Sequence, residues 1–177
     1  MSRNVLMVID MLKDFIDTDG ALNCGKKGRE IVPFVVEKVK EFMAQKEPII
    51  FIMDAHAPGD PEFSRFPVHC VYGTPGARLI DELASLVEEY PFTIKVPKTR
   101  FSGFFRTNLN RILEDLNPAA VYITGVCTNI CVLYTVEELR NRDYRTVVYS
   151  RGVASFEDEA HQWALKQMET VLGAEIL

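Results

Sequence analysis

The chain has 177 residues, enough for one compact domain with its own core, and 47% of them are apolar, as in ordinary globular proteins. Its net charge of −5 argues against a nucleic-acid-binding protein, which would need a basic stripe. No apolar run approaches the ~20 residues that cross a bilayer, and the first residues lack the apolar stretch of a secretory signal. We therefore expect a cytoplasmic protein with no membrane or nucleic-acid partner, whose four cysteines stay reduced.

Short apolar runs alternate with longer segments of helical periodicity. Strands are expected at 4–10, 48–54, 93–98, 119–125 and 145–150, and the tail AEIL could add a short sixth. Helices are expected at 28–47, 77–90, 105–117, 129–143 and 158–173. This alternation predicts an α/β fold, a three-layer sandwich with a central, mostly parallel, Rossmann-like sheet of about six strands and helices on both faces. The whole chain, 1–177, is expected to form a single domain.

Residues with reactive side chains follow the expected strands. Asp10, Asp54 and Lys98 end the first three strands, and the stretch GVCTNICV (125–132) follows the fourth. In open parallel sheets, ligands bind at the carboxyl ends of the strands, so these groups are predicted to meet at one edge. Each has an ordinary structural explanation when taken alone, as a strand-end cap, a surface lysine or a buried thiol. Their coincidence favours a catalytic site.

The two cysteines of GVCTNICV are expected to have different roles. Thr128 or Asn129 is predicted to be the N-cap of the next helix, which places Cys131 in its first turn. There, free amide N–H groups, the helix dipole and a nearby Lys98 would lower the pKa of the thiol. The alternative is that Cys131 is only a small buried apolar residue, and for Cys127 that alternative is favoured.

An activated thiol of this kind carries out acyl transfer. Asp10 could move the proton of the thiol, and backbone N–H groups around the turn would bind the oxyanion.

A second group of candidate residues surrounds the long Pro- and Gly-rich loop 55–76. A loop of this length in a compact domain is usually functional. Asp54, His56 and His69 form a plausible ligand set for Zn²⁺, or for Mn²⁺ or Fe²⁺. Taken alone, the same residues could instead serve only as hydrogen-bonding groups. The third histidine, His161, falls in the last expected helix and is expected at its surface.

Three segments together resemble a known family. VIDMLKDF (8–15), KTRFSGF (98–104) and GVCTNICVLYT (125–135) resemble, in order and placement, the three motifs of the isochorismatase-like cysteine hydrolase superfamily. The resemblance runs along nearly the whole chain. It implies a catalytic triad of Asp10, Lys98 and Cys131.

The resemblance also implies an unusual backbone at the catalytic turn. A cis peptide bond is implied between Val126 and Cys127, with the oxyanion held at Cys127 and Cys131. One departure from the pattern is Asn129, where many relatives have Asp. Asn remains a competent cap, so this departure does not endanger the triad.

Within the superfamily, the D-x-H segment followed by HC and GTPG resembles the nicotinamidase branch. The resemblance implies a divalent metal held by Asp54, His56 and His69, and Glu62 is similar to a fourth ligand of some members. Ala55 is a departure, because many nicotinamidases have Trp there. The resemblance further implies aromatic walls for a flat ring at Phe15, Phe66 and Phe101, which could equally be core aromatics.

The expected function is that of a metal-assisted cysteine amidohydrolase, a nicotinamidase that converts nicotinamide to nicotinate and ammonia through a Cys131 thioester. Its expected cofactor is one divalent ion, Zn²⁺ before Mn²⁺ or Fe²⁺. Its expected partner is a small-molecule amide, and the sequence leaves a homo-oligomer open. One alternative is an amidase of the same superfamily that acts on another small amide or carbamoyl compound. Two others are a metallohydrolase in which metal-bound water attacks and a catalytically inactive binding module.

Overall fold

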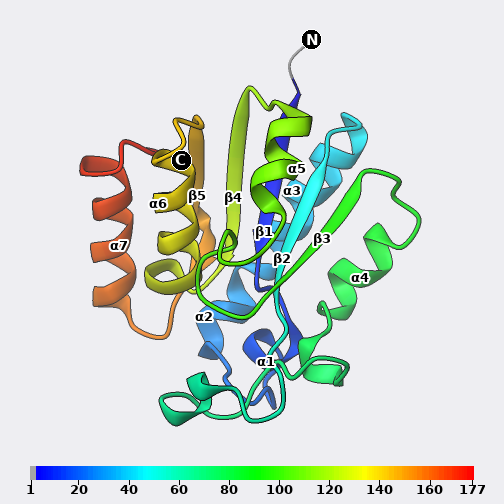
Figure 1. Ribbon diagram of the computed structural model, residues 1–177, viewed down its shortest axis with the longest axis vertical. Helices are drawn as coiled ribbons and strands as arrows, with labels where there is room; N and C mark the ends of the chain where they lie inside the picture. The colour runs from blue at the N-terminus through cyan, green and yellow to red at the C-terminus, as the bar shows by residue number, and fades with distance from the viewer. Residues whose placement is uncertain (1–2) are drawn as a thin grey trace.

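The computed structural model describes residues 3–177 (Figure 1). Its six strands form one sheet in the order β3-β2-β1-β4-β5-β6, and every neighbouring pair is parallel. The strands are β1 (Asn4–Ile9), β2 (Ile49–Asp54), β3 (Thr93–Lys98), β4 (Ala120–Val126), β5 (Thr146–Ala154) and β6 (Glu175–Ile176). The α-helices are α1 (Lys13–Ile16), α2 (Gly25–Glu30), α3 (Val32–Ala44), α4 (Asp81–Val87), α5 (Leu109–Leu116), α6 (Leu133–Arg140) and α7 (Asp158–Thr170).

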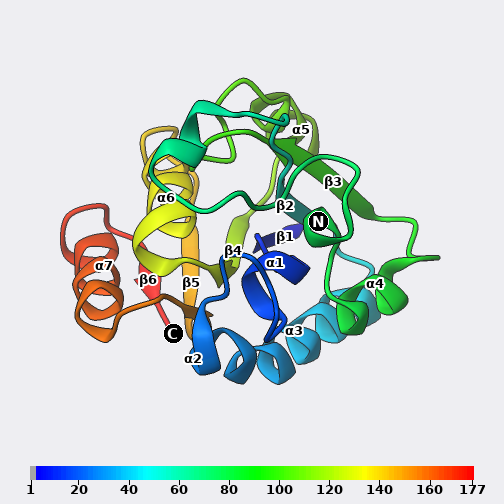
Figure 2. The ribbon, with the colours of Figure 1, turned by 90° about the horizontal axis from the view of Figure 1, so that it is seen from below.

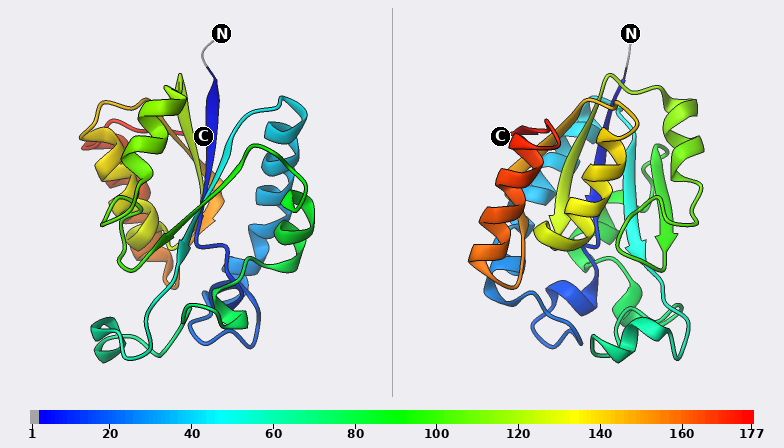
Figure 3. Two further views of the ribbon diagram at one scale, coloured as in Figure 1. Left: turned by 45° about the vertical axis from the view of Figure 1, so that its right-hand side comes forward. Right: turned by 60° about the vertical axis from the view of Figure 1, so that its left-hand side comes forward.

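The helices cover both faces of the sheet. Helices α3 and α4 lie on one face, and α5, α6 and α7 lie on the other (Figure 3). Along β1, Leu6 and Val8 belong to the core on the side of α3 and α4. Val5 and Met7 belong to the core on the side of α5, α6 and α7. A strand that is buried on both faces is apolar at every position, which is why the sequence marks it so clearly. The predicted fold class is confirmed.

Several helix boundaries differ from the predictions. The segment 28–47 was expected to be one helix, but it forms α2 and α3, which meet at Ile31, and a proline opens α3 where its missing N–H costs nothing. The helix expected at 77–90 begins only at Asp81, because an antiparallel bridge between Leu12 and Leu79 holds the preceding residues extended. Within residues 3–177, no helix is both long and apolar enough to cross a membrane.

The parallel pairing brings the strand ends to one edge of the sheet. Asp54 lies opposite Lys98 in the register of β2 and β3, and Ile9 lies opposite Gly125 in that of β1 and β4. Gly125 has a φ of +118°, and a Cβ atom there would lie 1.9 Å from the carbonyl oxygen of Ile9, so only glycine fits. Figure 2 looks toward this edge, which the loop 55–76 crosses.

Candidate active site

Asp10 leaves the end of β1 in a conformation that directs its carboxylate toward the neighbouring strand ends. Its φ of 52° lies in the left-handed region, which residues other than glycine adopt rarely, Asp more readily than most. Its Oδ1 accepts the backbone N–H of Asp54 at 2.9 Å, and its Oδ2 lies 2.8 Å from Nζ of Lys98. The side chain is fully buried, and burial followed by the neighbouring Asp54 carboxylate raises the pKa of Asp10 to about 6.

Lys98 is the centre of the buried charge cluster. Its ammonium group forms ion pairs with Asp10 and with Oδ1 of Asp54, and it lies 3.5 Å from Sγ of Cys131. Burial alone would lower the pKa of Lys98, but the two carboxylates outweigh burial and raise it well above the usual value. The residue is therefore a permanent cation beside the sulfur.

Cys131 lies in a short π-helical turn, Thr128–Val132, between β4 and α6. The residue before the turn is Cys127, no side chain caps it, and the prediction of a Thr128 or Asn129 cap is wrong. Thr128 is instead the first residue of the turn, while Asn129 accepts a hydrogen bond from the hydroxyl of Ser155. The peptide bond between Val126 and Cys127 is cis, as the resemblance implied.

The protonation of Cys131 differs from the prediction. Burial raises the pKa of this thiol well above its usual value, although the Lys98 ammonium opposes the shift. The Asp10 and Asp54 carboxylates add to the effect of burial, because they disfavour a further negative charge beside them. Asp10, Asp54 and Cys131 each bring a ligand or acceptor atom within 4.8 Å of the others, so a carboxylate lies close enough to receive the proton.

The second cysteine of the motif packs against a third. Sγ of Cys127 lies 3.2 Å from Sγ of Cys24, and both side chains are buried. Contact with the Cys24 thiol, followed by burial, raises the pKa of Cys127 well above the usual value. All four cysteines are free thiols. The side chain of Cys127 is thus a packing group, which agrees with the favoured alternative.

Asp54, His56 and His69 form a compact cluster beside Lys98. Nε2 of His56 and Nε2 of His69 lie 3.5 and 3.8 Å from Oδ2 of Asp54, and one atom from each residue lies within 4.8 Å of the other two. Each histidine engages its Nδ1 elsewhere, His56 with Asp60 and His69 with the carbonyl of Pro67 at 2.7 Å. Both Nε2 atoms therefore face the cluster, an arrangement typical of metal-ligating histidines.

Two orphaned polar atoms support a metal at this cluster. Nε2 of His56 and Oε2 of Glu62 are buried without a hydrogen-bond partner, and Oε1 of Glu62 lies 4.0 Å from Nε2 of His56. Burying unpaired polar groups is costly, and a divalent cation would satisfy both. Burial followed by the Asp54 charge raises the pKa of Glu62, a shift that a nearby cation would oppose. Asp54, His56 and His69 therefore fit a divalent ion, and Glu62 lies beside them.

A pocket opens above these groups. Asp54, Glu62, His69 and Cys131 contribute to its lining, and its apolar lining consists of Phe15, Leu22, Phe66, Phe101, Val126, Ile130 and Phe156 together with Cys127. The predicted aromatic residues Phe15, Phe66 and Phe101 are thus brought to the same pocket as the thiol. The aromatic and apolar character of the lining favours a small, flat, largely apolar substrate.

Comparison with known proteins agrees with this geometry. A family model described as the Isochorismatase domain matches residues 4–177. The chain belongs to the isochorismatase family. It is 36% identical to an uncharacterized isochorismatase family protein, PncA, of Bacillus subtilis (strain 168), over 98% of each chain. The chain is thus an isochorismatase-family hydrolase, and the predicted superfamily is confirmed.

Other similar proteins include a nicotinamidase, a pyrazinamidase and a probable inactive nicotinamidase. The crystal structure of nicotinamidase PncA from Bacillus subtilis superimposes with a TM-score of 0.94 at 32% identity, over 98% of each chain. A pyrazinamidase of Pyrococcus horikoshii in complex with zinc superimposes with a TM-score of 0.90 at 28% identity, covering 99% of this chain and 98% of that one. A probable inactive nicotinamidase of Arabidopsis thaliana is 32% identical, over 96% of this chain and 89% of its own.

Some residues of the pocket and its surroundings were not predicted from the sequence. Phe156 lines the pocket and follows the carboxyl end of β5, so the strand-end rule could have found it. Leu22 and Ile130 also line the pocket but carry no signal in the sequence beyond being apolar. Asp60, which contacts His56, was missed because its role depends on how the loop folds.

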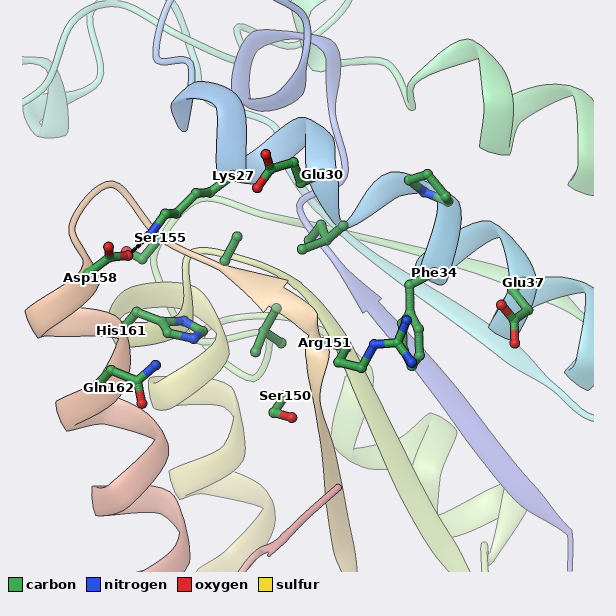
Figure 4. A pocket seen from close by; sticks show the side chains of 14 residues that line it. Lys27, Glu30, Phe34, Glu37, Ser150, Arg151, Ser155, Asp158, His161 and Gln162 are labelled. Carbon is green, nitrogen blue, oxygen red and sulfur yellow. Dashed lines mark ion pairs between the residues drawn. The ribbon is translucent and has the colours of Figure 1, made fainter.

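His161 does not lie simply at the surface, as had been expected. It is half-buried on α7, and its Nδ1 lies 2.8 Å from the hydroxyl of Thr128 in the π-helical turn that carries Cys131. Figure 4 shows His161 in a separate hollow lined by α2, α3, β5 and α7, near the ion pair of Lys27 and Asp158. Burial, followed by the charge of Lys27, lowers the pKa of His161, so a neutral ring supports the turn from outside.

Proposed function

We propose that the chain works as one domain that hydrolyses nicotinamide to nicotinate and ammonia through a thioester on Cys131. The observation that carries this proposal is the convergence of the Cys131 thiol, the Lys98 ammonium and the Asp10 carboxylate beside the Asp54 cluster. Asp54 joins the Lys98 ion pairs to the histidine cluster, since its Oδ1 pairs with Lys98 while its Oδ2 faces His56 and His69. Family membership and the nicotinamidases among the relatives support the same reaction.

The chain's own residues account for the covalent steps. With a pKa of about 6, Asp10 is ionised at neutral pH and accepts the proton of the Cys131 thiol as the sulfur attacks the carboxamide carbon. Asp10 then gives this proton to the departing ammonia. In the second half of the reaction, Asp10 takes a proton from water as the water oxygen attacks the thioester carbon. Nicotinic acid is released, and Asp10 returns the proton to the sulfur, which regenerates the thiol. Lys98 offsets the negative charge that develops in each step, and the amides of Cys127 and Cys131 are the proposed oxyanion donors.

Asp54, His56, His69 and Glu62 are the residues that would hold a divalent ion, for which Zn²⁺ is the first candidate. When bound, the ion would supply an electrophilic anchor for the ring nitrogen of the substrate. Phe15, Phe66 and Phe101 are the proposed walls for that ring. We place this activity in the cytoplasm, where the thiols stay reduced.

Ammonia release from nicotinamide tests the proposal. The purified protein should release ammonia from nicotinamide, lose this activity after treatment with a chelator, and regain it when Zn²⁺ or Mn²⁺ is added back. Benzamide is the matched control, because it has the same ring shape and carboxamide but no ring nitrogen to bind a metal. We expect much slower turnover of benzamide, and equal rates on the two amides would contradict anchoring through the ring nitrogen.

The closest alternative is an amidase of the family with another substrate. No turnover of nicotinamide, together with ammonia release from a different small amide or carbamoyl compound, would move the assignment there. The chemistry of Asp10, Lys98 and Cys131 would be unchanged in that case. The aromatic pocket favours nicotinamide over flexible carbamoyl compounds.

Two further alternatives concern the thiol itself. If metal-bound water attacked the substrate, Cys131→Ala would retain activity. If the protein were an inactive binding module, a thiol-reactive substrate analogue would show no preference for Cys131 over Cys70, a buried thiol that contacts the carbonyl of Gly76. We expect selective labelling of Cys131 and no turnover by Cys131→Ala.

A further inference from the structure

Asp60 joins three parts of the site that lie apart in the sequence. Its buried carboxylate places Oδ2 at 3.2 Å from Nδ1 of His56 and accepts the backbone N–H of Glu62 on Oδ1 at 2.9 Å. Nη1 of Arg100 lies 3.0 Å from both carboxylate oxygens. Arg100 follows the end of β3 two residues after Lys98, so Asp60 connects the loop 55–76 to the strand that carries the catalytic amine.

We propose that Asp60 is a positioning residue that fixes the ring of His56 with its hydrogen on Nδ1 and its lone pair on Nε2, ready to bind a divalent cation. This inference rests on the proposed function, because it concerns the residues of the metal site. Asp60 touches no metal or substrate itself. It acts through His56 and through the backbone of Glu62.

The chemistry of the two side chains determines the direction of the hydrogen bond. An ionised carboxylate only accepts hydrogen bonds, whereas a neutral imidazole has one donor and one acceptor nitrogen. Nδ1 of His56 lies 3.2 Å from Asp60, closer than Nε2 lies to Asp54, so in the neutral ring we assign the hydrogen to Nδ1 and the lone pair to Nε2. That atom is buried without a hydrogen-bond partner, 3.5 Å from Asp54 and 4.0 Å from Glu62. The opposite tautomer would set a lone pair against the Asp60 carboxylate and aim an N–H at the cation site.

The two histidines of the cluster differ in what orients them. His69 uses the backbone carbonyl of Pro67, which no side-chain substitution removes. His56 depends on the side chain of Asp60, and Asp60 depends on Arg100. The orientation of one ligand can therefore be changed by a substitution that leaves every proposed ligand in place.

Metal affinity of the Asp60→Ala variant tests the inference. Zn²⁺ is titrated into metal-free wild-type and variant protein in competition with a chromophoric chelator, and Asp60→Ala should bind about 10- to 100-fold more weakly. Ser64→Ala is the matched control, because it removes a hydrogen bond to Pro61 in the same loop without touching a proposed ligand. Its affinity should equal that of the wild type.

A second readout separates orientation from a general loosening of the loop. The chain has only three histidines, so ¹⁵N NMR of the metal-free protein at alkaline pH can assign the tautomer of His56. The wild type and Ser64→Ala should show hydrogen on Nδ1, and Asp60→Ala should show a shift toward Nε2. Asp60→Asn keeps the shape but has one acceptor oxygen instead of two, so it should lose part of the affinity even if Asp60→Ala folds poorly.

Arg100 gives a double-mutant test of the same chain of contacts. Arg100→Ala alone should weaken Zn²⁺ binding less than Asp60→Ala, and it should add little in the Asp60→Ala background, because both act through His56. Additive losses would show that Arg100 acts independently of Asp60.

Three results would overturn the inference. They are wild-type affinity in both Asp60 variants, an unchanged His56 tautomer in Asp60→Ala, and additive effects of the two substitutions. A wild-type protein that binds Zn²⁺ while the variants bind it equally well would remove the inference and leave the proposed function standing. A wild type that binds no divalent ion would remove the metal site and the inference together.

Discussion

The two halves of the site are held in place by different means. Asp10, Lys98 and Cys131 lie at or just beyond the ends of strands, where the parallel ladder and the turn after β4 fix their positions. His56, Glu62 and His69 lie on the loop 55–76, which hydrogen bonds from a few side chains and short backbone bridges hold in place. Asp54 belongs to both halves. Substitutions in the first half should therefore affect the chemistry or the core, and those in the second half should mainly affect metal binding.

Removing the proposed nucleophile, Cys131, should have the largest effect on activity and leave the second half intact. Cys131→Ala should lower kcat by a factor on the order of 10⁴ or more, as expected when a covalent nucleophile is lost. The variant should still bind one Zn²⁺ per chain, since Sγ of Cys131 is not among the proposed ligands. Kinetics and metal analysis on the same sample check this prediction. Cys70→Ala is the control for thiol loss in general and should retain activity.

Removing the ammonium group should break the connection between the two halves. Lys98→Met leaves Asp10 and Asp54 buried without their counter-ion, and breaking a buried pair costs about 3–5 kcal/mol of the free energy of unfolding. Turnover should be lost as well. Denaturant unfolding of Lys98→Met against the exposed control Lys40→Met measures the difference. Equal stability of the two variants would mean that the cluster is hydrated rather than buried.

The pH dependence of activity should follow Asp10. Its carboxylate form is the proposed base, so kcat/KM should fall as the pH drops through about 6, tenfold per unit. The effect on stability has the opposite sign. Because the native pKa lies above the unfolded value of 3.8, ionisation of Asp10 weakens the fold as the pH rises from about 4 to about 6. Activity that stays constant well below pH 6 would contradict the assignment of Asp10 as the base.

The support of the catalytic turn from outside should have the smallest effect. His161→Ala leaves the buried hydroxyl of Thr128 without its partner, which costs about 1–3 kcal/mol of the free energy of unfolding. We expect kcat to fall by less than tenfold, because the turn keeps its backbone hydrogen bonds from Ile130 and Val132 to the carbonyl of Cys127. Gln162→Ala, in the same hollow of Figure 4, is the matched control. A His161→Ala variant no less stable than this control would mean that the contact with Thr128 does not contribute to the free energy of unfolding.

The sequence allowed the fold and the strand-end residues to be predicted for one physical reason. Strands buried on both faces are apolar throughout, and the next polar residue then marks the edge where ligands bind, as for Asp10 and Asp54. The π-helical turn and its lack of a side-chain cap were not predictable, because the turn depends on packing against β5 and α7. Neither was the raised pKa of Cys131, which results first from the burial of the thiol and then from the carboxylates of Asp10 and Asp54.

The metal loop could be predicted only in part. The residue types of Asp54, His56 and His69 indicate ligands, but their geometry depends on how a loop of Pro and Gly residues folds back on the sheet. Asp60 resembled an ordinary turn residue in the sequence, and only its contacts with His56 and Arg100 distinguish it.

Trapping the covalent intermediate tests the central claim most directly. The protein is mixed with excess nicotinamide, quenched in acid during turnover and digested, and the peptides are analysed by mass spectrometry. The account predicts a nicotinoyl group on Cys131, its absence from the other three cysteines and its absence from the Cys131→Ala variant. Ammonia release by the wild type with no adduct on Cys131, and equal turnover by Cys131→Ala, would contradict it.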